Sequence, residues 1–166
     1  MQQALKLMNI QLSEVLTDIT GVTGQAILRA ILGGERDPLK LAQWRNPACK
    51  SSTDQIAKAL TGTWREELLF ILKQAVELYD DYTAKLRECD AQIERQFAAM
   101  KPRFESDDPS PPMPPVKPGS TSKNQPAYNV RAHLMRLTGV DLVAVTGISA
   151  SLAQTILSEI GTDMSR

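Results

Sequence analysis

The sequence contains few of the residues that usually carry chemistry. Its 166 residues include two cysteines, one histidine and only 5% aromatic side chains. Cys49 and Cys89 lie far apart and without CxxC spacing, so they indicate neither a disulfide framework nor a zinc site. Free thiols are typical of a reducing compartment, and we therefore expect a cytoplasmic protein.

The chain also lacks an excess of either charge and lacks long apolar runs. Its 19 Lys and Arg residues balance 19 Asp and Glu residues, so no overall field attracts a polyanion. Nucleic-acid binding would therefore have to come from local geometry or from a partner. No apolar run approaches the roughly 18 residues of a membrane span, and no basic-then-apolar signal segment follows Met1, so we expect no membrane partner.

The sequence shows no arrangement of side chains typical of a catalytic centre. His133 stands alone in a weakly amphipathic stretch and is expected to be a packed or surface histidine. Asp80 and Asp81 are adjacent on an expected helix, so they do not face the same way. Ser-His-Asp and Cys-His arrangements, Gly-rich phosphate loops and HExxH are absent. We expect no catalytic residue, metal site or cofactor in this chain, and we expect Trp44 and Trp64 to anchor the core.

What the sequence does contain is one pattern written twice. Residues 19–31 (ITGVTGQAILRAI) align without a gap with residues 145–157 (VTGISASLAQTIL). The alignment pairs Gly21 with Gly147, and Thr23 with Ser149. Both copies combine helical apolar spacing with a tight Thr-Gly turn and a following helix. This order is the sequence pattern of a helix-hairpin-helix.

A helix-hairpin-helix can hold a nucleic-acid backbone. Its turn glycines have no Cβ, so the chain approaches a phosphate closely, and the amides that begin the next helix donate to that phosphate. The hydroxyls that replace the second turn glycine can still donate. The alternative is that each turn only packs two helices. The candidate contact residues are Gly21, Thr23, Gly24, Gly147, Ser149 and Ala150.

Several shorter helices are expected before residue 64. Apolar residues at three- and four-residue steps predict one helix over residues 4–18, and a second helix runs from Gly24 to Gly33. Asp37-Pro38 predicts an N-cap followed by Pro at the first helical position. Ser52 with Gln55 predicts a capping box that starts a helix through Leu60.

The longest expected helix covers residues 64–101, beginning at a Thr63–Glu66 capping box. It would be roughly 55 Å long at 1.5 Å per residue. Its apolar positions step by four and three through more than four heptads, and Gln96 is the polar exception. This seam predicts a coiled coil that joins two copies, and the alternative is a long amphipathic helix of a monomeric bundle. The seam residues are Leu68, Leu72, Ala75, Tyr79, Tyr82, Leu86, Cys89, Ile93 and Met100.

The rest of the chain, residues 102–166, begins with a proline-rich linker. Eight of the ten prolines fall within residues 102–127, which predicts an extended connector. Helices are then expected over 130–137, 142–145 and 151–160. Because about 39 residues seldom bury enough surface to stand alone, residues 128–166 should pack poorly or dock on the N-terminal helices. The prediction is an all-α fold in four segments: 1–63, 64–101, 102–127 and 128–166.

Several stretches stand in a distinctive order along the chain: residues 16–24 (LTDITGVTG), 29–38 (RAILGGERDP), 69–70 (LF), 75–80 (AVELYD), 138–141 (TGVD), 145–149 (VTGIS) and 159–165 (EIGTDMS). Their order and spacing resemble the transposases of the insertion sequence 110 family, also called DEDD transposases. The resemblance covers nearly the whole chain outside the proline-rich segment. It implies the helical middle of such a transposase and the first part of its C-terminal domain.

The resemblance also implies where the chemistry of the family lies. Family members hold Mg²⁺ with four acidic residues of an N-terminal ribonuclease-H-like domain, and a C-terminal domain supplies a catalytic serine. These residues would fall before Met1 and after Arg166, so the resemblance assigns no catalytic residue to this chain. The family engages DNA together with a structured guide RNA, which implies both as partners.

We therefore interpret the chain as a fragment of a DNA transposase that is catalytically inert by itself. It would act in oligomerisation through residues 64–101 and in nucleic-acid contact through the two Thr-Gly turns. The alternative is a helical coiled-coil interaction protein with no nucleic-acid role. In that case the heptads bind a partner and the turns only pack.

Overall fold

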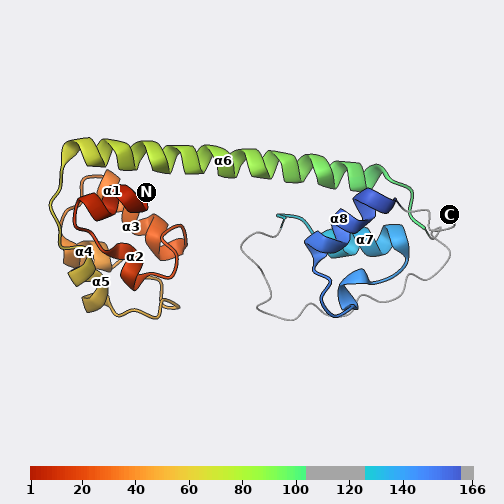
Figure 1. Cartoon of the computed structure of the whole chain (residues 1–166), viewed down its shortest axis with the longest axis horizontal. Helices are drawn as coiled ribbons and strands as arrows, with labels where there is room; N and C mark the ends of the chain where they lie inside the picture. The colour runs from red at the N-terminus through yellow and green to blue at the C-terminus, as the bar shows by residue number, and fades with distance from the viewer. Residues whose placement is uncertain (104–125, 162–166) are drawn as a thin grey trace. The chain divides into compact units, whose positions relative to one another are not determined.

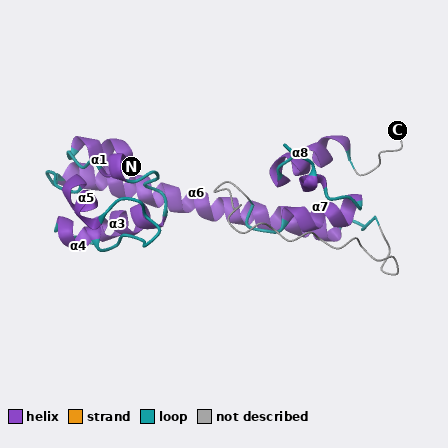
Figure 2. Cartoon of the chain, turned by 90° about the horizontal axis from the view of Figure 1, so that it is seen from below, coloured by secondary structure: helices purple, strands orange, loops and turns teal. Residues whose placement is uncertain are grey.

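The computed structural model describes residues 1–103 and 126–161 of the chain, and within these residues the secondary structure is entirely helical (Figures 1 and 2). The predicted all-α fold is confirmed. No helix of the described part is both long and apolar enough to cross a membrane. Most of the predicted linker lies outside the described residues. The elements are α1 (Gln2–Leu7), α2 (Leu12–Val15), α3 (Val22–Leu32), α4 (Pro38–Ala42), α5 (Thr53–Ala59), α6 (Glu66–Ala99), α7 (Val130–Thr138), the 3₁₀ helix η1 (Leu142–Ala144) and α8 (Ala150–Ile160).

The chain divides into two compact units, Met1–Tyr82 and Thr83–Arg166. We call them unit 1 and unit 2. Helix α6 contributes its first residues to unit 1 and its last residues to unit 2. Each unit has a cluster of buried apolar side chains of its own, so each is described separately.

Unit 1 packs α1–α5 and the first turns of α6 around one apolar core. Its central side chains, among them Leu5, Met8, Ile27 and Leu72, are fully buried. Two predicted helix starts are confirmed. The Ser52 hydroxyl accepts from Gln55 N and the Gln55 side chain accepts from Ser52 N, forming the capping box of α5. Asp37 accepts from Leu39 N at 2.9 Å in front of Pro38 and caps α4.

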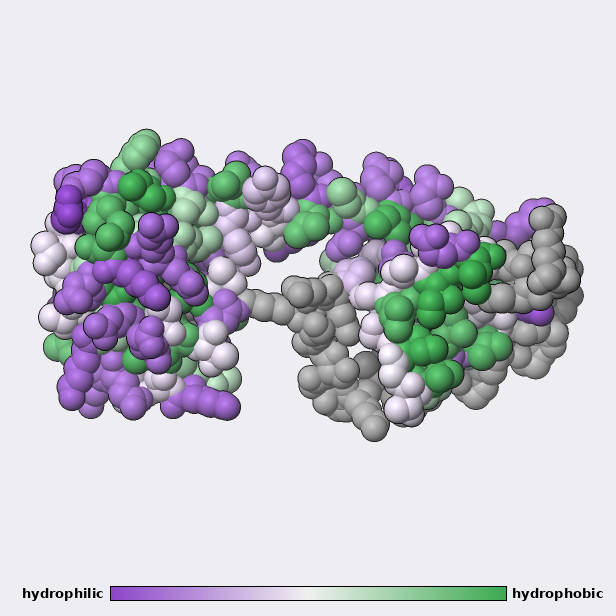
Figure 3. Space-filling view, viewed as in Figure 1, coloured by the Kyte–Doolittle hydropathy of each residue, from purple (hydrophilic) through white to green (hydrophobic). Residues whose placement is uncertain are grey.

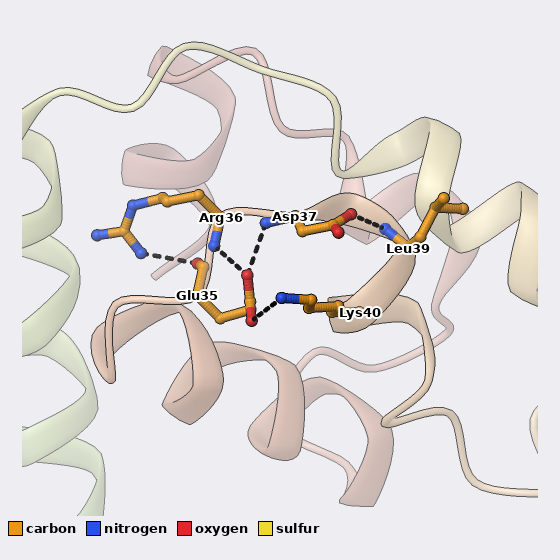
Figure 4. A network of polar contacts seen from close by, with 5 residues as sticks. All are labelled: Glu35, Arg36, Asp37, Leu39 and Lys40. Carbon is orange, nitrogen blue, oxygen red and sulfur yellow. Dashed lines mark hydrogen bonds and ion pairs between the residues drawn. The ribbon is translucent and has the colours of Figure 1, made fainter.

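The connection between α3 and α4 is held by the Glu35 carboxylate (Figure 4). Its Oε1 accepts from the backbone N–H of Arg36 and of Asp37, each at 2.9 Å, and its Oε2 lies 3.8 Å from Lys40 Nζ. The two backbone hydrogen bonds keep the pKa of Glu35 below its usual value. The Glu35 carboxylate therefore holds the change of chain direction between α3 and α4.

The prediction of a single helix over residues 4–18 is wrong, because the helix is interrupted at Asn9. Asn9 has φ 57, and its N–H donates to Lys6 O while Ile10 N–H donates to Leu5 O, which is a Schellman ending of α1. Asn tolerates this left-handed conformation better than most residues. Leu5, Ile10 and Leu12 are all fully buried, so the apolar side chains on both sides of the break pack into the same core.

The predicted start of the long helix is also corrected. Helix α6 begins at Glu66, so Thr63 cannot be its N-cap. Thr63 N–H donates instead to Met8 O at 2.9 Å, and a Cβ at Gly62 would lie 2.3 Å from that same oxygen. The segment Gly62–Thr63 therefore packs against the end of α1, and α6 begins only after this contact.

The two tryptophans of unit 1 have different environments. Trp64 is half-buried against the core, and the Arg36 guanidinium lies 5.0 Å from the centre of its ring. Trp44 is 57% exposed, so the expectation that it anchors the core is wrong.

Unit 2 packs α7 and α8 against the last turns of α6. Phe97 of α6 is buried in its small core with Val130, Leu134 and Leu157. The Phe97 ring stacks on His133 at 5.8 Å, so His133 is partly packed, which is one of the two environments expected from the sequence. Arg136 reinforces the contact, because its Nη1 donates to Met100 O at 2.9 Å. The predicted helices 130–137 and 151–160 are present as α7 and α8, while 142–145 forms the 3₁₀ helix η1.

Candidate functional sites

The turn before α3 is shaped by an acidic side chain. Thr20 donates to Asp18 Oδ1 from its backbone N–H at 2.8 Å and from its hydroxyl at 2.7 Å. Gly21 is the N-cap of α3, and a Cβ there would lie 3.2 Å from Asp18 O and 3.9 Å from Asp18 Oδ2. A carboxylate at this position repels a phosphate, and it opposes a backbone contact at this end of α3.

The other two candidate residues of this turn have packing roles. The Thr23 side chain is buried, and its hydroxyl accepts from Asn46 N at 3.0 Å. A Cβ at Gly24 would lie 2.1 Å from Ile19 O, so only glycine lets α3 approach the preceding chain this closely. Thr23 and Gly24 therefore hold unit 1 together.

The turn before α8 has a different geometry. Gly147 has φ 91, which favours glycine, and a Cβ there would have no neighbour within 4 Å among the described residues. Ser149 caps α8, with its hydroxyl accepting from Leu152 N at 3.1 Å, and Ala150 is the first helical residue. Gly147 and Ser149 are both exposed. This turn therefore presents its backbone to the surroundings.

The two copies of the sequence pattern are not two copies of one structure. In the first copy the N-cap is Gly21, whereas in the second it is Ser149, which lies two residues later in the alignment. Gly21 is extended, with φ −75 and ψ 177, while Gly147 is left-handed. The environments also differ, because Thr23 and Gly24 are both buried in unit 1, whereas Ser149 is exposed and Ala150 is only half-buried against the core of unit 2.

An ion pair fixes the segment that leads to α8. Arg131 Nε lies 3.0 Å from Asp141 Oδ1, and the second nitrogen of the guanidinium bonds Oδ2. The two side chains are only 19% and 12% exposed. The guanidinium, together with backbone N–H donors at the start of η1, lowers the pKa of Asp141. No sequence motif indicates this pair, since its partners lie ten positions apart with a turn between them.

The predicted heptad seam of α6 divides into a packed part and an exposed part. Leu68 and Leu72 are buried in unit 1, and Ala75 and Tyr79 are half-buried. From there on the seam is open: Tyr82 is 65% and Leu86 66% exposed, Cys89 is exposed, and Ile93 and Met100 keep more than a third of their surface in contact with solvent. Figure 3 shows apolar residues between charged ones along α6.

The last turns of α6 border an apolar groove within unit 2. The groove encloses about 680 Å³. Ile93, Phe97 and Met100 line it from α6, and Leu137 and Leu157 line it from α7 and α8. Figure 3 shows apolar surface gathered over the part of unit 2 that holds α7 and α8. The heptad pattern does not indicate Phe97, which lies one position off the seam beside the polar Gln96.

Within the part of the chain that the structure describes, the titratable side chains do not form a recognisable reaction centre. His133 Nε2 lies 3.6 Å from Glu94 and its ring contacts two aromatic rings. Asp80 is paired with Arg29 through two hydrogen bonds of 2.9 and 2.8 Å, which lower the Asp80 pKa. In residues 1–103 and 126–161, no three His, Cys, Asp or Glu side chains gather closely enough to hold a metal ion.

Comparisons of this chain with protein-family models, with curated proteins and with solved structures found no match.

Proposed function

We propose that this chain is the helical connecting region of a DNA transposase of the insertion sequence 110, or DEDD, type. In this proposal it joins two copies through α6 and contacts nucleic acid through the turn before α8. It has no reactive centre of its own, and it works in the cytoplasm. The observation that carries the proposal is the exposed part of the seam, Tyr82, Leu86, Cys89 and Ile93, on one face of a 34-residue helix.

The association of two copies is supported by the difference in burial between the first and the later heptad positions of α6. Apolar heptad positions are expected to be covered, and Leu68 and Leu72 are covered by the core of unit 1. The later positions keep the same spacing without such cover. A second helix with the same pattern would bury them, and apolar burial is the main driving force of protein association.

The nucleic-acid contact is supported at one turn only. Gly147 and Ser149 are exposed at the start of α8, where backbone amides and the helix dipole favour an anion. Gly21, Thr23 and Gly24 do not offer this, because Asp18 lies beside Gly21 and the other two are buried. DNA and a structured guide RNA are the partners that the family resemblance implies.

Binding to a DNA duplex and to a structured RNA hairpin, titrated at increasing salt, tests the contact. Ser151→Glu places a negative charge in the first turn of α8, which favours the helix but repels a phosphate. We expect it to weaken binding, while Thr155→Glu, which changes the charge the same way in the exposed middle of α8, weakens it less. A steep fall of affinity with salt is expected from phosphate contacts.

Two outcomes contradict the nucleic-acid part. One is a titration with no binding to either probe at low salt. The other is loss of binding on Val22→Glu at the start of α3 with no loss on Ser151→Glu, which would assign the contact to unit 1. Absence of binding would favour the second candidate, a helical interaction protein whose exposed seam binds a partner protein.

The proposal also states that this chain has no activity of its own. Mg²⁺ in the resembled family belongs to acidic ligands that we have not assigned to any residue here. We expect no strand cleavage or exchange when the chain is incubated with duplex DNA and Mg²⁺. Robust cleavage by the pure chain would overturn this part.

A further inference from the structure

The residues that flank the exposed seam of α6 determine how a second copy would lie against it. In heptad notation, Leu86 and Ile93 occupy a positions and Cys89 occupies a d position. The positions that flank the seam are then g for Lys85 and Gln92, and e for Thr83 and Asp90. In a two-stranded coiled coil these flanking residues decide the orientation and the register of the helices.

The flanking charges favour one orientation. In a parallel pair the g residue of one helix meets the e residue five positions later in its partner, so Lys85 meets Asp90 of the other copy. In an antiparallel pair g residues meet g residues and e residues meet e residues. Among Leu78, Lys85 and Gln92 no g residue is acidic, and Thr83 and Asp90 include no basic e residue, so no register of that kind forms a Lys–Asp pair.

The charges also fix the register. Moving one helix by a heptad places Lys85 beside Thr83 or Phe97 of the other copy, and Asp90 beside Leu78 or Gln92. Only the in-register parallel arrangement forms two Lys85–Asp90 pairs. Both side chains can serve this role beside their present contacts, because an ammonium has three donors and a carboxylate accepts several bonds. Lys85 Nζ lies 2.9 Å from Glu88 Oε2, and Asp90 Oδ2 accepts from Ala127 N at 2.9 Å.

The length of the pairing surface follows from the groove of unit 2. Beyond Ile93, the seam positions Gln96 and Met100 look into the groove that α8 borders with Gln154 and Leu157. The open stretch therefore ends near Ile93. A seam of this length predicts weak, concentration-dependent pairing, because coiled coils usually need more heptads than this for strong association.

We infer that α6 of two copies pairs parallel and in register over the stretch from Tyr82 to Ile93, with Lys85 of each copy beside Asp90 of the other. This rests on the proposed self-association and adds its orientation. It places Cys89 in the same layer as its counterpart in the second copy. Both thiols are then close enough to be joined, whereas an antiparallel pair separates them unless its register centres on this residue.

Thiol cross-linking of the full chain tests the register. Cys49→Ser leaves Cys89 as the only thiol, and copper-phenanthroline serves as the added oxidant that takes two electrons as two thiols release two protons. We expect a disulfide-linked dimer from Cys49→Ser and none from Cys89→Ser. A second single-thiol variant, Ile93→Cys with both natural cysteines replaced by serine, should also cross-link.

Charge reversal tests the orientation without any thiol. Lys85→Glu turns two attractive pairs into two repulsive ones and should weaken dimerisation about ten-fold. Adding Asp90→Lys in the same chain restores attraction in the parallel register and should recover most of the loss. The matched control is Arg87→Glu, which makes the same charge change at the outward b position and should leave dimerisation almost unchanged.

The outcomes separate this inference from the proposed function. A chain that stays monomeric at every concentration removes both. A chain that dimerises by sedimentation, but gives no cross-link through residue 89 or 93 and no recovery in the double variant, removes the parallel register and leaves the self-association. Circular dichroism of each variant confirms that the helices are intact.

Discussion

At the scale of single residues, the space around each glycine shows whether it serves packing or is open to a ligand, which a sequence motif does not distinguish. Gly24 and Gly147 both belong to Thr-Gly patterns, and either could have served a phosphate. The space that surrounds them decides between the roles. Gly24 faces Ile19 O at a distance that excludes any side chain, whereas Gly147 faces open space. Sequence spacing alone does not show how close the Ile19 backbone lies to Gly24.

Gly24→Ala is expected to destabilise unit 1 by about 2–3 kcal/mol, because the added Cβ collides with rigid backbone. Urea unfolding followed by tryptophan fluorescence measures this, since Trp44 and Trp64 are the only tryptophans and both lie in unit 1. The matched control is Gly33→Ala at the end of α3, which should change stability by less than about 1 kcal/mol. An unchanged midpoint for Gly24→Ala would show that the approach to Ile19 is not needed.

The Arg131–Asp141 pair makes the stability of unit 2 sensitive to acid. The Asp141 pKa is lower in the folded protein than in the unfolded chain, so its contribution is complete above the ordinary carboxyl pKa of about 3.9 and is lost as pH falls through the folded value. Asp141→Asn should therefore cost about 1–3 kcal/mol at neutral pH and flatten the loss in acid.

Amide NMR signals of α7 and α8, followed from neutral to acidic pH, measure this effect. Glu159→Gln serves as the control, because Glu159 is exposed on α8 of the same unit. If Asp141→Asn kept the acid sensitivity of the natural chain, another carboxylate would be responsible.

At the scale of helices, two of the three predicted N-caps are confirmed, while the predicted cap at Thr63 and the continuous helix over residues 4–18 are wrong. The Ser52–Gln55 box and the Asp37-Pro38 start depend on neighbouring residues, and both are present as predicted. The break at Asn9 is closed by local hydrogen bonds to Lys6 and Leu5, whereas the late start of α6 follows a hydrogen bond from Thr63 N–H to Met8 O, a contact between residues 55 positions apart. The apolar stripe from Leu5 to Ile19 has helical spacing even though the backbone turns within it.

Helix α6 predicts opposite effects for two of its leucines. Leu72 is fully buried, so Leu72→Ala should cost about 2–5 kcal/mol of unfolding free energy in unit 1. Leu86 is 66% exposed, so Leu86→Ala should leave the unfolding of the monomer nearly unchanged and weaken self-association. Urea unfolding at low concentration and sedimentation equilibrium at high concentration measure the two effects separately. Equal effects of both substitutions on monomer stability would contradict this division of the seam.

At the scale of the whole molecule, the chain has two separate apolar cores, and α6 contributes residues to both. The core of unit 2 is small, and Phe97 of α6 is buried in it together with side chains of α7 and α8. The general form, helices with a long heptad-containing member, followed from periodicity. The assignment of Phe97 to the core did not, because the heptad pattern places the neighbouring Gln96 on the seam.

The central claim is that this chain associates through the open part of α6. Native mass spectrometry of the full chain over a rising concentration series tests it most directly, with Leu86→Ala measured alongside. The account predicts a growing fraction of dimer for the natural sequence and a smaller fraction for Leu86→Ala at each concentration. A single compact monomer at every concentration, identical for the two proteins, would contradict it.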